Sequence, residues 1–259
     1  MMAKPFIKWA GGKTRLIKHY EQYFPTSYRR YIEPFVGGGA VFFHLAPKRA
    51  LLGDYNDELI KTYTAVRDSV EGVIDLLSTY PNEETFFYAI REKSPDELSL
   101  IELAARFIYL NKNNFNGMYR LSKLSGNSNV PFGKHTEKYI CDVGGLRLTS
   151  KALQRTTLKS GSYEKTLLAA RSRDLIYLDP PYDSVGHTQY TLDGFDFGDQ
   201  RRLAEEVSRL DALGCYIMLS NSDTSRIRAL YTKFTIIPIT TTRSISRKAT
   251  DRGKRFQNY

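Results

Sequence analysis

Four consecutive residues, Asp179, Pro180, Pro181 and Tyr182, carry the sharpest chemical pattern in the chain. They directly follow an apolar run, LIYL, so a strand should deliver them to the carboxyl edge of a sheet. The Asp179 carboxylate and the Pro180 carbonyl are two acceptors beside the flat ring of Tyr182. Two acceptors and a ring fit an adenine outside its base stack, with the acceptors bound to the N6 amino hydrogens. The alternative for any four-residue match is a loop stiffened by proline, with an incidental tyrosine.

A glycine turn, GGG at residues 37–39, offers a second candidate site. Asp54 ends the next apolar run, 17 residues after Gly37, close to the spacing of an acidic residue that binds ribose hydroxyls. The full fingerprint G-x-G-x-x-G is absent, which disfavours a nicotinamide or flavin and leaves other adenosine-bearing cofactors. Alternatively, the glycines serve only the geometry of a tight turn between a strand and a helix.

The stretch FIKWAGGKT, residues 6–14, has the glycine, lysine and threonine of a phosphate-binding loop. A P-loop follows G-x-x-x-x-G-K-[ST], which would require a glycine where Ile7 stands. No long apolar strand precedes the stretch either. An ATP-binding loop is therefore excluded, and this segment needs another role.

An α/β arrangement would position these residues, because a strand, a glycine turn, a helix and a second strand form a βαβ unit with a parallel sheet. The expected strands are residues 31–35, 50–56, 174–179, 215–220 and 234–242. Helices are expected over residues 13–23, 40–45, 57–80 and 197–214, and after Ser99, which forms a capping box with Glu102. We expect one α/β domain from residues 1–57 and 146–259, with a mostly helical insertion, 58–145, that carries a polar loop rich in basic and aromatic residues.

The composition of the 259-residue chain is ordinary apart from its charge. Thirty-eight Lys and Arg against 28 Asp and Glu give a net charge of +10, which favours a polyanionic partner, although a basic globular protein without such a partner fits equally. The two cysteines, Cys141 and Cys215, have no metal-site spacing and suit a reducing cytoplasm, so we expect no metal and no disulfide. No run reaches the roughly 18 to 20 apolar residues of a membrane span, so we expect a soluble cytoplasmic protein, by default a monomer.

Eight blocks occur in a characteristic order between about residue 6 and residue 246: FIKWAGGK, IEPFVGGGAVF, GDYN, LNKNNFNGMYR, NVPFGKH, DPPY, SNSD and RSIS. In this order the chain resembles Dam-type DNA adenine-N6 methyltransferases. The resemblance implies a Rossmann-like methyltransferase domain that uses S-adenosyl-L-methionine. It also implies that the insertion is a target-recognition domain for a short palindrome in double-stranded DNA, typically GATC, and that the target adenine is flipped out of the duplex.

The resemblance assigns roles residue by residue. It implies that Asp179, Pro180 and Tyr182 are catalytic. The cofactor-binding residues that it implies are Trp9, Ala10, Gly11, Gly12, Lys13, Phe35, Gly37, Gly39, Asp54, Ser162, Tyr163 and Asp179. The DNA-binding residues that it implies are Lys8, Phe115, Asn116, Gly117, Met118, Arg120, Asn129, Pro131 and His135. Among these, Arg120 would read a guanine through its paired donors and Phe115 would stack into the gap left by the flipped base, while His135 by itself fits a polar surface residue.

Some features depart from the family pattern. The loop between Arg120 and Pro131 is about one residue longer than in close relatives, and Met118 and His135 are not the commonest residues at their places. The end of the chain, KATDRGKRFQNY, replaces an acidic, apolar final strand by either a divergent strand or a basic tail. Alternatives for function are an RNA or protein-glutamine amine methyltransferase and a DNA-binding relative without catalysis.

Overall fold

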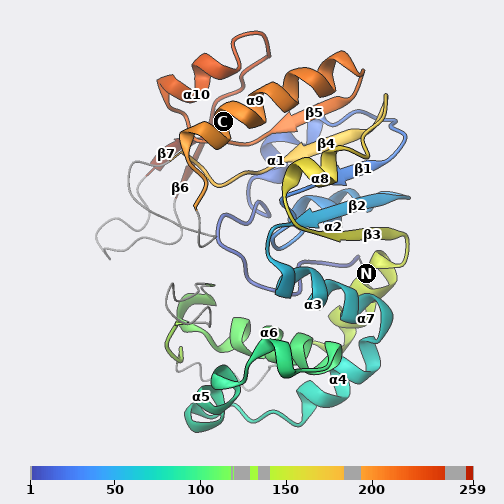
Figure 1. The fold of residues 1–259 in the computed structure, drawn as a ribbon, viewed down its shortest axis with the longest axis vertical. Coiled ribbons are helices and arrows are strands. Elements are labelled where there is room, and N and C mark those ends of the chain that lie inside the picture. Colours follow the sequence, from blue (N-terminus) through green and yellow to red (C-terminus); the bar gives the residue numbers. More distant parts are fainter. Residues whose placement is uncertain are drawn as a thin grey trace.

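A five-stranded parallel sheet forms the centre of the computed structural model, which describes residues 2–117, 119, 129–133, 141–183, 194–242 and 255–258. The strands are β1 (Tyr31–Glu33), β2 (Ala50–Asp54), β3 (Thr156–Ser160), β4 (Leu175–Leu178) and β5 (Tyr216–Leu219), in the order β3-β2-β1-β4-β5. Every pairing in this sheet is parallel, so all carboxyl ends meet at one edge, on the left in Figure 1. The expected α/β fold is confirmed.

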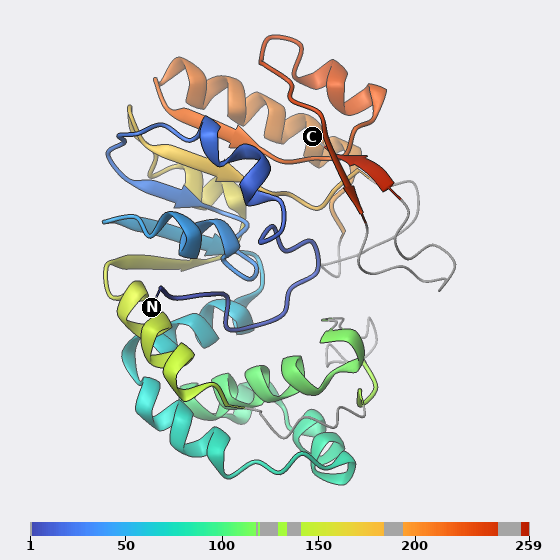
Figure 2. The ribbon, with the colours of Figure 1, turned by 180° about the vertical axis from the view of Figure 1, so that it is seen from behind.

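Helices cover both faces of this sheet. Helices α8 (Tyr163–Leu167) and α9 (Phe197–Ala212) lie on the face seen in Figure 1, and α1 (Ile17–Tyr20) and α2 (Ala40–Leu45) on the face seen in Figure 2. The strand residues therefore divide with a period of two: Leu175 and Tyr177 join one buried cluster, while Ile176 and Leu178 join the other. Because both faces are covered, β4 reads as a continuous apolar run rather than an alternating one.

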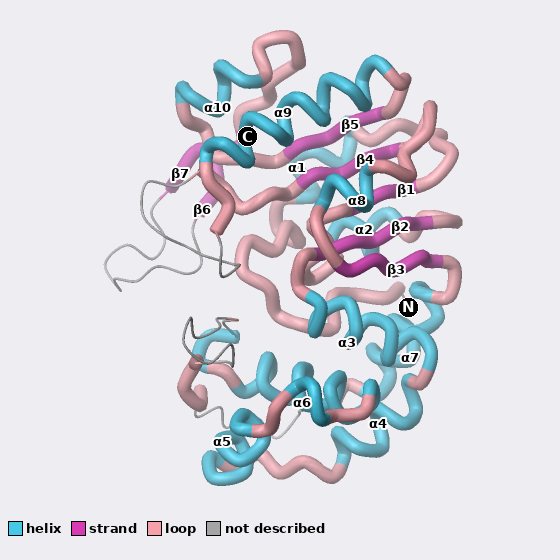
Figure 3. Tube along the Cα trace, in the orientation of Figure 1, coloured by secondary structure: helices cyan, strands magenta, loops and turns pink. Residues whose placement is uncertain are grey.

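A group of helices extends from the β3 side of the sheet (Figure 3). Its members are α3 (Asp57–Asp68), α4 (Val70–Ser78), α5 (Glu84–Glu92), α6 (Leu100–Asn113) and α7 (Val143–Leu153). Helix α3 packs against β2 and β3 as well as against α6, so one hydrophobic cluster continues from the sheet into the insertion. Within the insertion, the buried guanidinium of Arg106 joins α6 to α3 and α5, because it contacts Glu58 at 3.2 Å and donates to the carbonyl of Ile90 at 3.1 Å. No helix among the described residues is long and apolar enough to cross a membrane.

One of the expected helix starts is confirmed, and three other elements differ from what local signals predicted. The capping box at α6 is confirmed, since Ser99 and Glu102 exchange both hydrogen bonds. The expected helix over residues 57–80 is instead two helices, α3 and α4, which are separated at Ser69 by a backbone φ of −143°. Residues 13–23 form only the short α1 and a 3₁₀ turn, Glu21–Tyr23. Strand β3 was missed because its sequence, TTLKS, has little apolar content, as befits an edge strand.

The end of the chain forms a hairpin of its own. Only β6 (Ile239–Thr242) of the expected strand 234–242 is paired as a strand, and it begins directly after Pro238, which cannot donate to a ladder. Its antiparallel partner is β7 (Arg255–Asn258), within the segment that departs from the family pattern. The divergent-strand interpretation of this segment is therefore confirmed over residues 255–258.

Candidate active site

An ion pair between Lys13 and Asp179 lies at the carboxyl edge of the sheet. Lys13 Nζ is 2.7 Å from Asp179 Oδ2, and the lysine is almost fully buried, with 5% of its surface exposed. The same ammonium donates to the carbonyl of Gly11 at 2.7 Å and lies 4.9 Å from the ring centre of Tyr182. Burial raises the pKa of the Asp179 carboxyl, and the Lys13 ammonium opposes that rise. The opening motif and the DPPY loop, far apart in sequence, therefore form one charged centre.

Hydrogen bonds from side chains that the sequence analysis did not single out hold the DPPY loop in place. Gln200, buried on α9, donates to the carbonyl of Pro181 at 2.8 Å and accepts from Asn221 at 2.9 Å. Ser222 donates to the carbonyl of Asp183 at 2.8 Å. Asn221 and Ser222 belong to the SNSD block, whose presence in the motif order was the one signal that could have pointed to them. These contacts fix the loop that carries Asp179.

Asp54 organises the glycine turn from the end of β2. Its Oδ2 accepts the N–H of Gly37 at 3.0 Å and its Oδ1 accepts the N–H of Asn56 at 3.0 Å. Burial raises the pKa of Asp54 to about 6, while these backbone donors act in the opposite direction. Gly37 and Gly39 have φ of 45° and 68°, in the left-handed region that glycine adopts without strain. A Cβ on Gly37 would lie 2.6 Å from the Trp9 ring.

Glu33, at the end of β1, is a buried carboxyl that the sequence analysis missed. It accepts a hydrogen bond from Tyr31 Oη at 2.9 Å, and burial raises its pKa well above the ordinary value.

Tyr63 donates from α3 to the carbonyl of Gly37 at 3.0 Å, so the glycine turn is also held through its backbone oxygen. The turn is thus fixed at both its N–H and its C=O groups.

Aromatic rings flank the turn on the α8 side. Phe35 stacks on Tyr163, the first residue of α8, with ring centres 5.3 Å apart. Ser162 is the N-cap residue of the same helix. Phe195, which the sequence analysis did not select, packs edge-on against Phe35 at 6.1 Å. Planar apolar walls of this kind suit a purine ring.

Trp9 connects the glycine turn with the insertion. Its ring stacks on Tyr119 at 5.2 Å and on Phe107 of α6 at 6.5 Å. The following residues, Ala10, Gly11 and Gly12, form a turn in which the Gly12 N–H donates to the Trp9 carbonyl at 3.1 Å. Gly11 takes a φ of 78° there, and its carbonyl accepts from Lys13. One short segment therefore contacts the charged centre at one end and the insertion at the other.

Several of the predicted DNA-binding residues lie together beside this segment. Asn111 of α6 accepts from the Lys8 N–H at 2.8 Å and donates to the Lys8 carbonyl at 2.7 Å. Gly117 packs so closely on the Lys8 side chain that any Cβ there would clash with it. Phe115 is 46% exposed, and its N–H donates to the carbonyl of Pro131 at 2.9 Å.

The structure places the remaining candidates only in part. Asn129 is exposed. Asn116 lies in a 3₁₀ turn, Phe115–Gly117, of which the structure describes only the backbone at this residue. Met118, Arg120 and His135 lie outside the described residues.

Comparison with known proteins places this geometry in a family. Residues 9–245 match the D12 class N6 adenine-specific DNA methyltransferases. The chain is similar to Type II methyltransferase M1.LlaDCHI of Lactococcus lactis subsp. cremoris, with 37% identity over 97% of this chain and 92% of that protein. It is also similar to a DNA adenine methylase of Vibrio cholerae (32% identity; 97% of this chain, 93% of the relative) and to the Retron Ec67 DNA adenine methylase of Escherichia coli (34%; 92% and 84%).

The match covers the glycine turn, the Lys13–Asp179 centre, the insertion and the SNSD block in a single alignment. The relatives are matched over nearly their whole lengths. The chain therefore belongs to the D12 class of S-adenosylmethionine-dependent, N6 adenine-specific DNA methyltransferases.

Proposed function

We propose that this enzyme flips the adenine of a GATC site out of duplex DNA and methylates its N6 at the Asp179 centre. The observation that carries the proposal is the buried Lys13–Asp179 pair on a loop braced by Gln200, at the carboxyl edge of the sheet. Ligands of open parallel sheets bind at this edge. The GATC target follows from the resemblance of the motif order to Dam-type enzymes.

The residues around the glycine turn fit S-adenosylmethionine. The Phe35 and Tyr163 rings offer planar contacts for an adenine, and the Asp54 carboxylate offers acceptor capacity for ribose hydroxyls. Gly37 and Gly39 let the backbone approach the cofactor closely. We propose that the segment from Trp9 to Lys13 forms the opposite wall of the cofactor pocket. When bound, the cofactor supplies an electrophilic methyl group on its sulfonium.

Asp179 and the Pro180 carbonyl would orient the target amine. The N6 lone pair is delocalised into the adenine ring, so the amine is a poor nucleophile. Two hydrogen bonds from N6 to these acceptors would draw the nitrogen towards a tetrahedral geometry and release the lone pair for in-line attack. The bound cofactor would supply the methyl group that N6 gains, and N6 would lose one proton. Tyr182 would stack on the flipped ring.

We propose that the insertion, residues 58–145, reads the target sequence. Lys8, Phe115 and Gly117 lie side by side at its junction with the catalytic domain, and Phe115 is exposed. An exposed aromatic at this place suits the gap that a flipped base leaves in the duplex. Asn116, Met118, Arg120, Asn129, Pro131 and His135 complete the proposed recognition set, with Arg120 as the guanine reader.

The test is transfer of a tritiated methyl group to duplexes that differ only by the presence of GATC. Wild-type enzyme should label the GATC duplex alone, and Asp179→Asn should abolish labelling. Asp211→Asn, which changes an exposed carboxyl at the end of α9, is the matched control and should label normally. Equal labelling of both duplexes would refute the GATC target. Labelling of RNA or of a glutamine-bearing protein instead would refute the DNA substrate, and activity in Asp179→Asn would refute the centre.

A further inference from the structure

A basic groove runs along the amino ends of the strands, on the side of the sheet opposite the candidate active site. It lies between the segment before β1 (residues 26–30), the segment between α2 and β2 (residues 45–50), and the start of β3. Five cationic side chains line it: Arg29, Arg30, Lys48, Arg49 and Arg155. No lining residue is acidic, and the open groove has a volume of about 1110 Å³, far more than one small anion requires.

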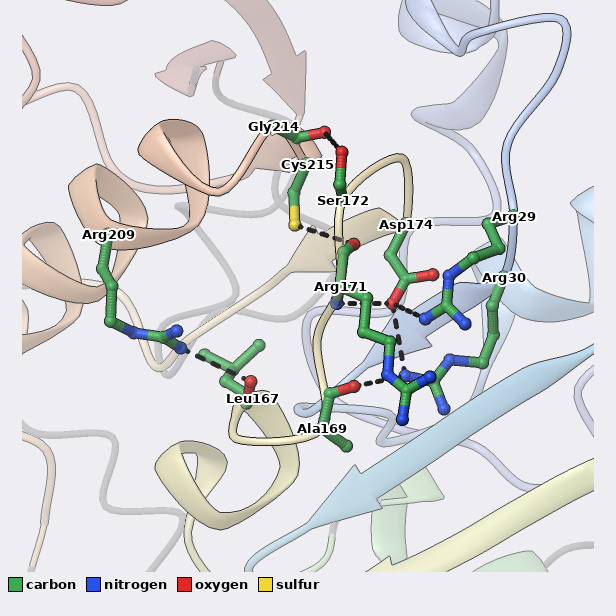
Figure 4. A network of polar contacts seen from close by, with 10 residues as sticks. All are labelled: Arg29, Arg30, Leu167, Ala169, Arg171, Ser172, Asp174, Arg209, Gly214 and Cys215. Atoms are coloured by element: carbon green, nitrogen blue, oxygen red, sulfur yellow. Dashed lines mark hydrogen bonds and ion pairs between the residues drawn. The ribbon is translucent and has the colours of Figure 1, made fainter.

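A single buried carboxylate, Asp174, contacts two of these arginines, Arg29 and Arg30 (Figure 4). Asp174 Oδ2 lies 2.8 Å from Arg29 Nη2 and 3.2 Å from Arg30 Nη2, and it also accepts the Arg171 N–H at 3.0 Å. The Asp174 side chain is fully buried, so it holds the two guanidinium groups in place while offering nothing to solvent. Among the residues that the structure describes, Asp174 is the only acidic ion-pair partner of these five cations, so the groove carries a net positive charge.

The other three cations are exposed at the surface. Lys48, Arg49 and Arg155 form no ion pair with any residue that the structure describes. Thr26 and Ser27 add hydroxyl groups to the lining. Arginine, lysine and hydroxyl side chains are the groups that contact phosphate oxygens in protein–DNA complexes.

The position of the groove separates it from the reacting centre. Arg30, Arg49 and Arg155 each directly precede a strand, whereas Asp54 and Asp179 stand at the carboxyl ends. Strands of four or five residues span roughly 15 Å at about 3.3 Å per residue. Duplex DNA has a persistence length of about 150 base pairs, so a short duplex at the active edge does not bend round to the amino edge.

We propose that this amino-edge groove binds the phosphate backbone of a second DNA segment while a first segment occupies the active site. The second segment is either a separate duplex or a distant part of the same DNA molecule. The enzyme then holds two duplexes at once, one read by the insertion and one held only through its phosphates. Contacts to phosphates carry no sequence information, and they weaken as the salt concentration rises.

The test compares two double variants at exposed positions. Arg49→Glu/Arg155→Glu reverses the charge, and Arg49→Lys/Arg155→Lys preserves it. Each protein, with one equivalent of a short unlabelled GATC duplex bound, is titrated with a labelled duplex that lacks GATC, and anisotropy is followed. Wild type and the lysine variant should bind the second duplex, and the glutamate variant should bind it at least tenfold more weakly. For the glutamate variant, the slope of log K against log salt should be smaller in magnitude than that of the wild type by about 1.8, because each of the two lost phosphate contacts contributes about 0.9.

A second readout keeps this proposal distinct from the proposed function. Methylation of a short GATC duplex should be equal in both variants, and thermal unfolding should confirm that both are folded. Three outcomes would overturn the inference: no second duplex bound by wild type, equal binding by the glutamate and lysine variants, or impaired methylation of the short duplex by the glutamate variant. Tighter binding of a double-stranded RNA of the same length would overturn the assignment to DNA. The inference rests on the proposed GATC target for the blocking duplex, whereas binding of the labelled duplex is measured without catalysis, so loss of second-duplex binding and loss of methylation are distinguishable failures.

Discussion

Replacing Lys13 by methionine should shift the acidic limb of the methylation pH profile upward. The substitution keeps the apolar stem of the side chain but removes the ammonium 2.7 Å from Asp179 Oδ2. Two unit charges at that distance attract by about 6 kcal/mol at an effective dielectric constant of about 20. Removing one partner of a buried pair typically costs about 3–5 kcal/mol, because the other charge stays buried without compensation. The Asp179 side chain is only 19% exposed, so solvent screens little of this.

That free energy appears as a change in the pKa of Asp179. Loss of the Lys13 ammonium removes the influence that lowers this pKa, so the pKa of Asp179 should rise further above the level to which burial already raises it. A protonated carboxyl loses acceptor capacity towards the adenine N6. The acidic limb of the kcat/KM profile should therefore lie at higher pH in the variant than in the wild type, and the deficit in kcat/KM should be much larger at about pH 6 than at about pH 9.

The assay is kcat/KM for methyl transfer to a short GATC duplex across this range, with cofactor affinity measured separately by calorimetry. Lys18→Met, at an exposed lysine on α1, is the matched control and should leave the profile unchanged. A deficit of the same size at every pH would refute the electrostatic argument. It would show that Lys13 acts through its contact with the Gly11 carbonyl or on the cofactor instead.

Three further predictions concern other parts of the molecule. Burial raises the pKa of Asp54 to about 6, so affinity for S-adenosylmethionine should fall as the pH drops below that value and the carboxylate is protonated; calorimetry should find no such dependence in Asp54→Asn. Asp174→Ala removes the shared partner of Arg29 and Arg30, whose side chains are 41% and 23% exposed, and should lower the free energy of unfolding in urea by about 1–3 kcal/mol, against at most about 0.5 kcal/mol for Asp211→Ala. Gln200→Ala frees the Pro181 carbonyl and should lower kcat by about 10- to 100-fold, with the cofactor KM nearly unchanged; a changed KM with normal kcat would contradict the bracing role.

Features that depend on neighbouring residues could be predicted from the sequence. A few consecutive residues are enough to predict three such features: the strand before Asp179, the glycine turn before α2 and the capping box at Ser99. The hairpin strand β7 was among the two interpretations of its segment and is now established. In these places local propensity and burial agree, and the structure follows them.

Features that depend on distant residues could not be predicted in the same way. Gln200 reaches Pro181 across 19 residues of chain, and Asn111 contacts Lys8 across 103 residues. Neither side chain has a pattern around it that signals a hydrogen bond, because a single amide is compatible with many environments. The Asp174 cluster was missed for the same reason, since its arginines read as ordinary surface charge until the fold brings them to one carboxylate.

The place of Trp9 gives the enzyme an internal optical reporter. It is the chain's single tryptophan, and it lies between the glycine turn and the insertion, stacked on Tyr119 and Phe107. Indole emission depends on the polarity and packing around the ring, so selective excitation reads this junction alone without any label. Cofactor entering on one side and DNA engaging the insertion on the other should each change the emission. The order of the two binding events, and any hinge motion between them, can thus be timed in the native protein by stopped-flow fluorescence.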